Sequence, residues 1–360
     1  MNQERNNKVL KLIDRYVGIP LVFLFGLKSK NQNFPKEINN IAILATAAIG
    51  DTLIMSGAIN SIKEKYPNSK ITLYCGSTNY EISKLLNNID NVEKLPIKNV
   101  FKAKKIIQEH IYDIWIDFGP WPRLNSILTS FAKSNFKIGF NTSGQYRHFI
   151  YDKWAIHNDF VHEHENYCEL LKCININDFE KPKLTLKDNT ENNLDKYVVL
   201  HLFAGGSKAD LKQLPLEKWI EIAKYIIDKG YKIYLTGSTN DFEKLENFII
   251  TSKLKISNMA GKLSLEQTAQ IINNAKLSIS IDTGIMHLAS VLNCSLIAIH
   301  GPTSPKRWGP LSNKAYFVYL NKNCSPCISL GFESKCTNNI CMTDITLKDI
   351  TNIIEENNLL

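Results

Sequence analysis

Short apolar runs rich in β-branched residues alternate with helical stretches along most of this chain. In the first half, candidate strands at 41–45, 71–75, 113–117 and 136–139 are separated by helical patterns at 50–66, 79–87, 101–109 and 123–133. Strands that alternate with helices predict a parallel sheet covered by helices on both faces. The sequence therefore predicts an α/β fold.

A second series of the same kind begins at Tyr197. Candidate strands at 197–201, 232–236, 277–281 and 296–300 alternate with helical patterns at 215–229, 239–253, 264–274 and 284–292. Two such series predict two Rossmann-like, doubly wound domains that face each other across a cleft, with ligands at the carboxyl ends of the strands. A length of 360 residues suits two domains. We predict an N-terminal extension (1–40), a first domain (41–180), a linker (181–196), a second domain (197–345) and a C-terminal helix (346–360).

The predicted extension combines basic charge with an apolar run at 16–27. Residues 1–40 hold these basic and acidic residues: Arg5, Lys8, Lys11, Arg15, Lys28, Lys30 and Lys36 against Glu4, Asp14 and Glu37. The run is shorter than the roughly 20 apolar residues that span a bilayer, and it lacks a signal-peptide cleavage site. It can lie on an anionic membrane surface, or it can pack on the domain or on a partner.

Composition narrows the class of protein. Hydrophobic residues make up 44% of the chain and charged residues 22%, as in soluble globular proteins. The net charge of +8 comes without the basic stripe interleaved with aromatic residues that nucleic-acid binding favours, so no nucleic-acid partner is expected. We expect a cytoplasmic protein, peripheral on the inner face of the membrane if the extension binds lipid.

The first motif with chemical content follows the first predicted strand. Gly50 permits a tight turn there, and Asp51 comes next, at the start of a helix and at the mouth of the predicted cleft. A carboxylate in that place can take a proton from an incoming hydroxyl, as a general base does. Aspartate is also common at helix starts for structural reasons alone.

A glycine pair follows the first strand of the second series. Gly205 and Gly206 let backbone N–H groups approach an anion, Ser207 adds a hydroxyl, and Lys212 adds a positive charge. The pattern is neither a Walker A loop nor a dinucleotide-binding fingerprint, and a plain surface loop with a solvated lysine would look the same.

The strongest motif is Asp282-Thr283-Gly284, with His287 three residues later. A buried strand ends at Asp282 and a helix begins directly after the turn, so the first helical turn offers N–H groups and a dipole to a pyrophosphate. Aspartic proteases also carry Asp-Thr-Gly, but they need two such aspartates and this chain has one. The sequence therefore predicts a phosphate site.

Half of the eight cysteines cluster near the C-terminus. Cys324, Cys327, Cys336 and Cys341 can hold a structural zinc or iron ion, or they can form a loop of reduced thiols. His162 and His164 resemble a metal site, but on a helix they point to different faces, and we expect them to begin a polar helix near the acceptor.

Together these segments resemble glycosyltransferase family 9, the ADP-heptose:lipopolysaccharide heptosyltransferases. The resemblance rests on Gly50-Asp51, on the loop 205–215, on 258–265, on 282–289 and on Gly301-Pro302-Thr303. It implies a GT-B fold with an N-terminal acceptor domain and a C-terminal donor domain. It also implies an inverting reaction that needs no cofactor, with ADP-heptose as the donor and a lipopolysaccharide core or related glycan as the acceptor.

The resemblance gives the site residues their roles. Asp51 matches the general base. Donor contacts fall on Gly205, Gly206, Ser207, Lys212, Met259, Gly261, Asp282, Thr283, Gly284 and His287. On the acceptor side we predict Thr46, Gly50, Arg123 and His164.

Some residues depart from the family pattern and leave alternatives open. The usual Pro-Gly of the donor loop is Ala204-Gly205-Gly206 here, and the tryptophan that often precedes Pro215 is Leu214. A nucleotide-sugar epimerase of GT-B shape would share the architecture without needing an acceptor. A binding protein stapled by a metal at the cysteine cluster is the alternative that is not an enzyme.

Overall fold

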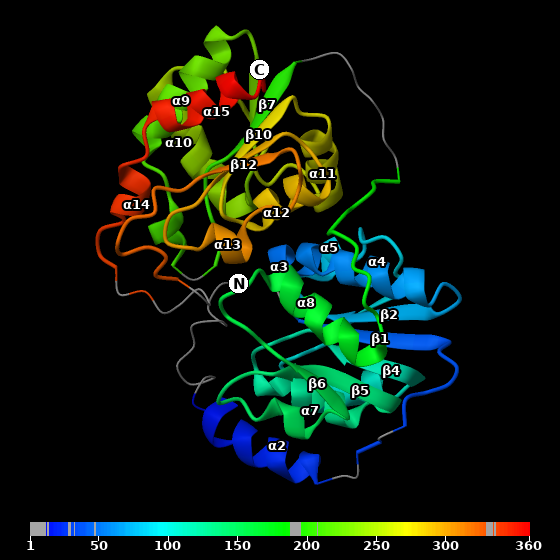
Figure 1. The fold of residues 1–360 in the computed structure, drawn as a ribbon. Helices are drawn as coiled ribbons and strands as arrows, with labels where there is room; N and C mark the ends of the chain where they lie inside the picture. Colours follow the sequence, from blue (N-terminus) through cyan, green and yellow to red (C-terminus); the bar gives the residue numbers. More distant parts are fainter. Residues whose placement is uncertain are drawn as a thin grey trace. The chain divides into compact units, whose positions relative to one another are not determined.

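The computed structural model describes residues 12, 14–27, 30–31, 33–46, 48–187, 196–206, 208–328, 334 and 336–360. The chain divides into two compact units, Asn7–Leu184 (the N-terminal unit) and Thr185–Leu360 (the C-terminal unit). In Figure 1, each unit contains one parallel sheet with helices packed on both faces.

The N-terminal unit has a six-stranded sheet of order β3-β2-β1-β4-β5-β6, in which all the paired strands are parallel. Its strands are β1 (Asn40–Ala45), β2 (Lys70–Cys75), β3 (Asn91–Lys94), β4 (Ile111–Asp117), β5 (Lys133–Asn141) and β6 (Lys153–Ile156). Its helices are α2 (Gly18–Gly26), α3 (Ile49–Ile54), α4 (Ser56–Lys65), α5 (Tyr80–Ser83), α6 (Val100–Ile107), α7 (Arg123–Phe131) and α8 (Glu163–Leu171).

The C-terminal unit has a six-stranded parallel sheet of order β12-β11-β10-β7-β8-β9. Its strands are β7 (Tyr197–His201), β8 (Lys232–Leu235), β9 (Ser257–Asn258), β10 (Leu277–Ile281), β11 (Leu296–Ile299) and β12 (Ala315–Val318). Its helices are α9 (Leu216–Asp228), α10 (Phe242–Ser252), α11 (Leu265–Asn273), α12 (Gly284–Val291), α13 (Pro305–Trp308), α14 (Ile340–Thr343) and α15 (Leu347–Glu356).

The two sheets have the same strand order when the second is read from its other edge. β1 and β7 hold equivalent places, and so do β4 and β10. In each sheet the order reverses between these two strands, which is where doubly wound folds bind ligands, outside the carboxyl ends. The loops after β1, β4, β7 and β10 are therefore where a site is expected in each unit.

The core of the C-terminal unit explains why β10 is so clear in the sequence. All five residues of β10 are buried, and a strand covered by helices on both faces reads as a continuous apolar run. Helix α15 packs on α9, and its Ile350 and Ile354 join the core with Trp219 of α9. The predicted C-terminal helix is thus part of the C-terminal unit.

The structure differs from the predicted elements in two ways. The helix predicted at 50–66 is two helices, α3 and α4, separated at Met55. Strands β3, β6, β9 and β12 were not predicted, and all four lie at the edges of their sheets. Their residues are largely exposed or half-buried, so the apolar run that marks a central strand is missing.

Candidate active site

Two of the predicted donor residues, Lys212 and Asp282, lie at the strand reversal of the C-terminal sheet. Lys212 ends a 3₁₀ turn at Ala209–Lys212 in the loop after β7, and Asp282 directly follows β10, the neighbouring strand. The Lys212 Nζ donates to Asp282 Oδ2 at 2.7 Å, and the Thr303 hydroxyl donates to the same oxygen at 2.7 Å. The structure thus brings together two residues that are 70 positions apart in the chain.

The charge of Asp282 is set by its neighbours. The carboxylate is buried, which by itself raises its pKa, but Lys212, His300 and His287 outweigh burial and hold the pKa of Asp282 well below its usual range. His300 is fully buried, and burial lowers its pKa. An ionised Asp282 repels phosphate, so its chemistry suits orienting Lys212 rather than touching a diphosphate.

Lys212 can still serve a ligand. Its side chain keeps 19% of its surface exposed while that of Asp282 keeps 8%. The Lys212 ammonium has three N–H donors. With the Asp282 carboxylate on one side, it can still donate to a ligand on another side. The pair can therefore present an oriented positive charge at the carboxyl edge of the sheet.

Helix α12 begins at this point. Thr283 is its N-cap, and its hydroxyl accepts from the N–H groups of Ile285 at 3.2 Å and Met286 at 3.4 Å. The sequence predicted that N–H groups of this turn would be free for a pyrophosphate, but Thr283 caps two of them. His287, the fourth residue of α12, is buried. The dipole of α12 remains as a favourable field for an anion.

Two predicted donor glycines, in the loops after β7 and β9, have left-handed backbone conformations. Gly206 has a φ of +88°, in the left-handed region, and a side chain at this position would have no atom within 4 Å of its Cβ. Gly206 is thus an open, left-handed turn position. Gly261 has a φ of +68°, and a Cβ there would lie 2.8 Å from the Cα of Thr239. Gly205 is exposed and Met259 is half-buried beside these loops, whereas Ser207 lies outside the described residues.

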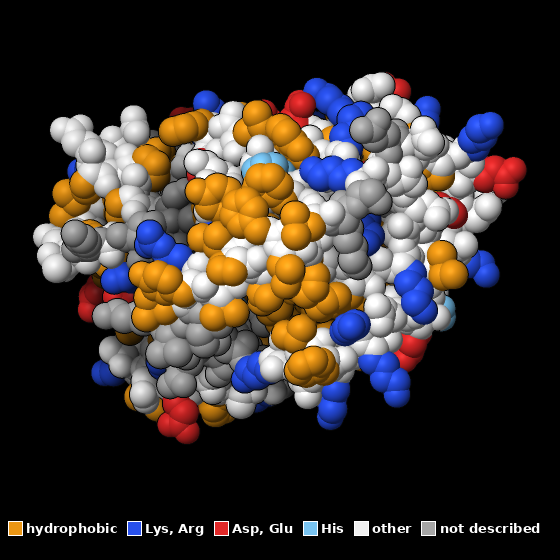
Figure 2. Space-filling view, turned by 90° about the horizontal axis from the view of Figure 1, so that it is seen from below, with side chains coloured by type: hydrophobic (Ala, Val, Ile, Leu, Met, Phe, Trp, Pro, Cys, Tyr) orange, Lys and Arg blue, Asp and Glu red, His pale blue; other side chains and the backbone are white. Residues whose placement is uncertain are grey.

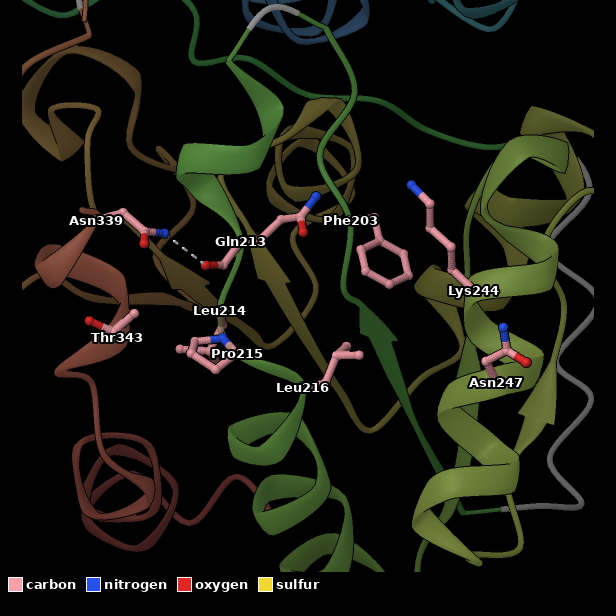
Figure 3. A pocket seen from close by; sticks show the side chains of 9 residues that line it. All are labelled: Phe203, Gln213, Leu214, Pro215, Leu216, Lys244, Asn247, Asn339 and Thr343. Carbon is pink, nitrogen blue, oxygen red and sulfur yellow. Dashed lines mark hydrogen bonds between the residues drawn. The ribbon is translucent and has the colours of Figure 1, made fainter. Parts of the chain in front are cut away.

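Asn339, which precedes α14, contacts the turn that carries Lys212. Its amide donates to the carbonyl oxygens of Leu211 at 3.2 Å and Gln213 at 3.3 Å, on either side of Lys212. Figure 3 shows the contact with Gln213 at the edge of a pocket of about 470 Å³. None of the predicted donor residues that the structure describes lines this pocket.

In the N-terminal unit, Asp51 lies in the first turn of α3, in the loop region that follows β1. Its Oδ2 accepts from the backbone N–H of the N-cap residue, Ala48, at 3.1 Å. The capping role that the sequence left open is therefore present. A half-buried carboxylate in this place can hold the helix start and still meet a substrate hydroxyl.

Thr46 and Asn125 join the loops after β1 and β4. The Thr46 hydroxyl donates to Asn125 Oδ1 at 2.9 Å, and Asn125 is buried in the first turn of α7. Gly50 is buried inside α3. The predicted acceptor-side residues Thr46 and Gly50 thus lie at the strand reversal of the N-terminal sheet, as Asp51 does.

The comparisons with known proteins bear on this arrangement. The model of glycosyltransferase family 9 (heptosyltransferase) matches residues 100–337, well over half of the chain. The chain belongs to glycosyltransferase family 9. Lipooligosaccharide heptosyltransferase 2 of Haemophilus influenzae is 24% identical over 317 residues, which cover 78% of this chain and 88% of the relative. Lipopolysaccharide heptosyltransferase 2 of Escherichia coli is 34% identical over 120 residues, only 32% of this chain and 34% of that relative.

Solved structures share the fold of this chain. The E. coli ADP-heptose lipopolysaccharide heptosyltransferase II has a TM-score of 0.72 at 19% identity, covering 89% of this chain and 99% of that one. An E. coli heptosyltransferase solved with ADP has a TM-score of 0.70 at 21% identity, covering 88% and 99%. Identities this low establish the fold alone, and they confirm the predicted GT-B fold of this family 9 glycosyltransferase.

Two further acceptor-side predictions fall on residues with internal contacts. Arg123, at the start of α7, is buried, and its guanidinium pairs with Asp14 at 2.6 Å. His164 lies on α8, where its Nε2 is 3.6 Å from the Sγ of Cys168. Burial lowers the pKa of His164 to about 4, with smaller contributions in the same direction from His162 and Lys181. Acceptor roles for both stay predictions.

The described part of the cysteine loop gives no support for the metal that the sequence left open. Cys327 Sγ lies 3.3 Å from the Ser334 hydroxyl, and Cys336 Sγ donates to the carbonyl of Asn338. Burial, and to a smaller extent the neighbouring thiols Cys327, Cys324 and Cys336, raise the pKa of Cys341 to about 11. Across the described ranges, no three His, Cys, Asp or Glu side chains are placed to hold a metal ion.

Proposed function

We propose that this family 9 enzyme transfers heptose from ADP-heptose to a lipopolysaccharide core acceptor. The observation that supports it most is the Lys212–Asp282 pair at the start of α12, because its partly exposed lysine presents an oriented positive charge where a diphosphate is expected. The lipooligosaccharide heptosyltransferase of H. influenzae favours this sugar and this class of acceptor, and the E. coli heptosyltransferase structures with ADP-heptose or ADP in their descriptions favour this nucleotide.

In the proposed reaction, the acceptor hydroxyl attacks the anomeric carbon of the heptose while the bond from that carbon to the diphosphate oxygen breaks. The bonding electrons leave with the diphosphate, whose growing negative charge is stabilised by Lys212 and by the dipole of α12. Asp51 takes the proton of the attacking hydroxyl. A single displacement of this kind inverts the anomeric configuration.

Asp282 acts in this proposal through Lys212. Its carboxylate holds the Lys212 ammonium at 2.7 Å, and Thr303 holds the same carboxylate oxygen. The donor site thus has its positive charge in place before the substrate arrives, which lowers the reorganisation needed during transfer.

The test uses Asp51→Asn, because asparagine keeps an oxygen that can accept from the Ala48 N–H and so preserves the helix start. Transfer should fall by roughly 10²–10⁴-fold, as expected for the loss of a general base. The affinity for ADP, measured by titration calorimetry, should stay within about twofold. Equal loss of ADP binding, or transfer at the wild-type rate, would show that Asp51 is not the base.

A thermal-shift screen of nucleotide sugars tests the donor. A ligand that binds the folded state raises the unfolding temperature, so ADP-heptose should give the largest shift.

Incubation with the donor alone separates transfer from epimerisation. A transferase releases little ADP without acceptor, whereas an epimerase converts the sugar.

A further inference from the structure

Helix α2 is apolar on both of its faces. One face, with the buried Val22, packs against α7 and the turn at Arg147–Phe149. The other face is exposed and is formed by residues at helical spacing: Tyr16, Val17, Pro20, Phe23, Leu24 and Leu27. A helix that is apolar all round is normally buried all round, so the exposed stripe needs a cover. We propose that this stripe docks on an anionic phospholipid surface.

The surroundings of the stripe favour lipid over a protein partner. The Phe23 ring lies 5.5 Å from that of Tyr146 and 4.8 Å from that of Phe149. Tyr146 and Trp154 are partly exposed, and Trp154 contacts His148 in the same turn. Tyrosine and tryptophan are the side chains that prefer the boundary between hydrocarbon and headgroups. The apolar stripe is thus bordered by residues suited to that boundary.

The charge next to the stripe is positive. Arg15 is exposed just before α2, and Lys30 is exposed after it, with its Nζ 3.3 Å from the carbonyl of His148. The two nearby acids are engaged inward: Asp14 pairs with Arg123, and Asp152 accepts from the N–H groups of Asn31 and Lys137. The sequence adds Arg5, Lys8, Lys11 and Lys28, against the single further acid Glu4, before and after α2 within residues 1–30. Each such basic charge favours an anionic surface.

Figure 2 looks at the molecule from the side of α2. Hydrophobic side chains gather over this face, with lysine and arginine side chains around them and few acidic ones. Helix α2 has nine residues, and no helix in the part of the chain that the structure describes is long and apolar enough to cross a bilayer. The helix therefore suits a position in the plane of the interface.

The proposed docking helix is tied to the acceptor end of the N-terminal unit. Asp14, in the segment before α2, accepts from the backbone N–H of Arg123 at 2.9 Å and caps the start of α7. Two residues further into α7, Asn125 holds Thr46. This consequence rests on the proposed function: lipid contact through α2 would hold the loop that bears Asp51 near a surface containing a lipid-linked acceptor.

The test is flotation of the full chain with vesicles of phosphatidylglycerol and phosphatidylethanolamine, against vesicles of phosphatidylcholine. Wild type should float with the anionic vesicles, and less as salt is raised. Leu24→Ser/Leu27→Ser removes two exposed side chains of the stripe and should weaken binding at least about tenfold. Phe101→Ser, which changes an equally exposed residue on α6, should stay within about twofold. Arg15→Gln should weaken binding about fivefold.

Failure of the wild type to float with anionic vesicles would overturn the proposal, and so would flotation of Leu24→Ser/Leu27→Ser at the wild-type level. Light scattering tests the alternative that a second copy of the chain covers the stripe. That alternative holds if the wild type does not bind vesicles and is a dimer, and if Leu24→Ser/Leu27→Ser is a monomer. Flotation needs neither donor nor acceptor, so its result is separate from that of the transfer assay. Unchanged thermal unfolding of each variant shows that it is folded.

Discussion

The two units carry a charged pair at equivalent places, the carboxyl ends of β4 and β10. In the N-terminal unit Asp117 accepts from Arg147 and from the Tyr151 hydroxyl, each at 2.6 Å, and both charged side chains are fully buried. In the C-terminal unit Asp282 accepts from Lys212, which keeps 19% of its side-chain surface exposed. Equivalent strand ends thus hold one fully buried pair, Arg147–Asp117 (the sealed pair), and one partly exposed pair, Lys212–Asp282 (the accessible pair). Position in the sheet therefore does not by itself make a ligand site.

The donors explain the difference. The Arg147 guanidinium also donates to the carbonyl oxygens of Gly119 and Trp121, so both of its terminal nitrogens are directed to groups of the same unit, while its Nε is buried without a partner among the described residues. The Lys212 ammonium has three donors, and at most two of them are directed to Asp282, to its Oδ2 at 2.7 Å and its carbonyl oxygen at 3.5 Å. A sealed arginine therefore suits a structural role, and a partly exposed lysine suits an incoming phosphate.

The largest expected effect breaks the sealed pair. Arg147→Met leaves Asp117 buried without a counter-charge and should lower the free energy of unfolding by about 3–5 kcal/mol. Urea unfolding measures this loss. Arg147→Met/Asp117→Asn should recover part of it, and the transfer rate per folded molecule should match wild type in both variants. Loss of transfer at unchanged stability would place Arg147 in the active site instead.

The accessible pair should give the opposite outcome. Lys212→Met should lower the rate of transfer roughly 10²–10³-fold, because the leaving diphosphate loses its positive charge. Lys212→Met/Asp282→Asn removes the unpaired carboxylate as well and should recover stability without recovering transfer. Lys224→Met, on the exposed side of α9, is the control and should have wild-type kinetics. Recovery of transfer in the double variant would mean that Lys212 serves only to neutralise Asp282.

Asn339 offers a smaller test of the accessible pair. Asn339→Ala removes two hydrogen bonds that hold the backbone around Lys212 and should raise the KM for the donor about threefold to tenfold, with kcat little changed. Asn338→Ala, its exposed neighbour, is the matched control. A lower unfolding temperature at an unchanged KM would show that Asn339 supports the fold without positioning Lys212.

Much of the fold could be predicted because the central strands carry their own signal. β10 was predicted with its observed bounds, since it is covered on both faces and all of its residues are apolar or small. The edge strands β3, β6, β9 and β12 were not, because fewer neighbours cover them and their residues stay polar or exposed. The break at Met55 lies in a continuous helical pattern and leaves no clear mark in the sequence.

The candidate site was predictable only in its local part. Asp282-Thr283-Gly284 joins a buried strand to a helix within a few residues, and Lys212 lies near a glycine pair. The pairing of Lys212 with Asp282 follows from the adjacency of β7 and β10, which local patterns do not contain. Asn339 and Asn125 act across separations of 128 and 79 residues, and neither lies in a motif. The role of Asp51 stays a prediction.

The smallest effect concerns pH and sharpens the role of Asp282. Because Lys212, His300 and His287 outweigh burial and depress the pKa of Asp282 in the folded state, its contribution to stability is fully present above the pKa of about 4 of an unfolded aspartate. As the pH falls below that value, the unfolded chain takes up a proton that the folded chain does not, so the contribution declines. The difference in unfolding free energy between wild type and Asp282→Asn, measured in urea, should be constant from about pH 8 to pH 5 and shrink below pH 4. If the difference in unfolding free energy instead grows as the pH falls, the Asp282 carboxylate binds a proton more readily in the folded state than in the unfolded state. The ion pair with Lys212 would then not be formed in solution.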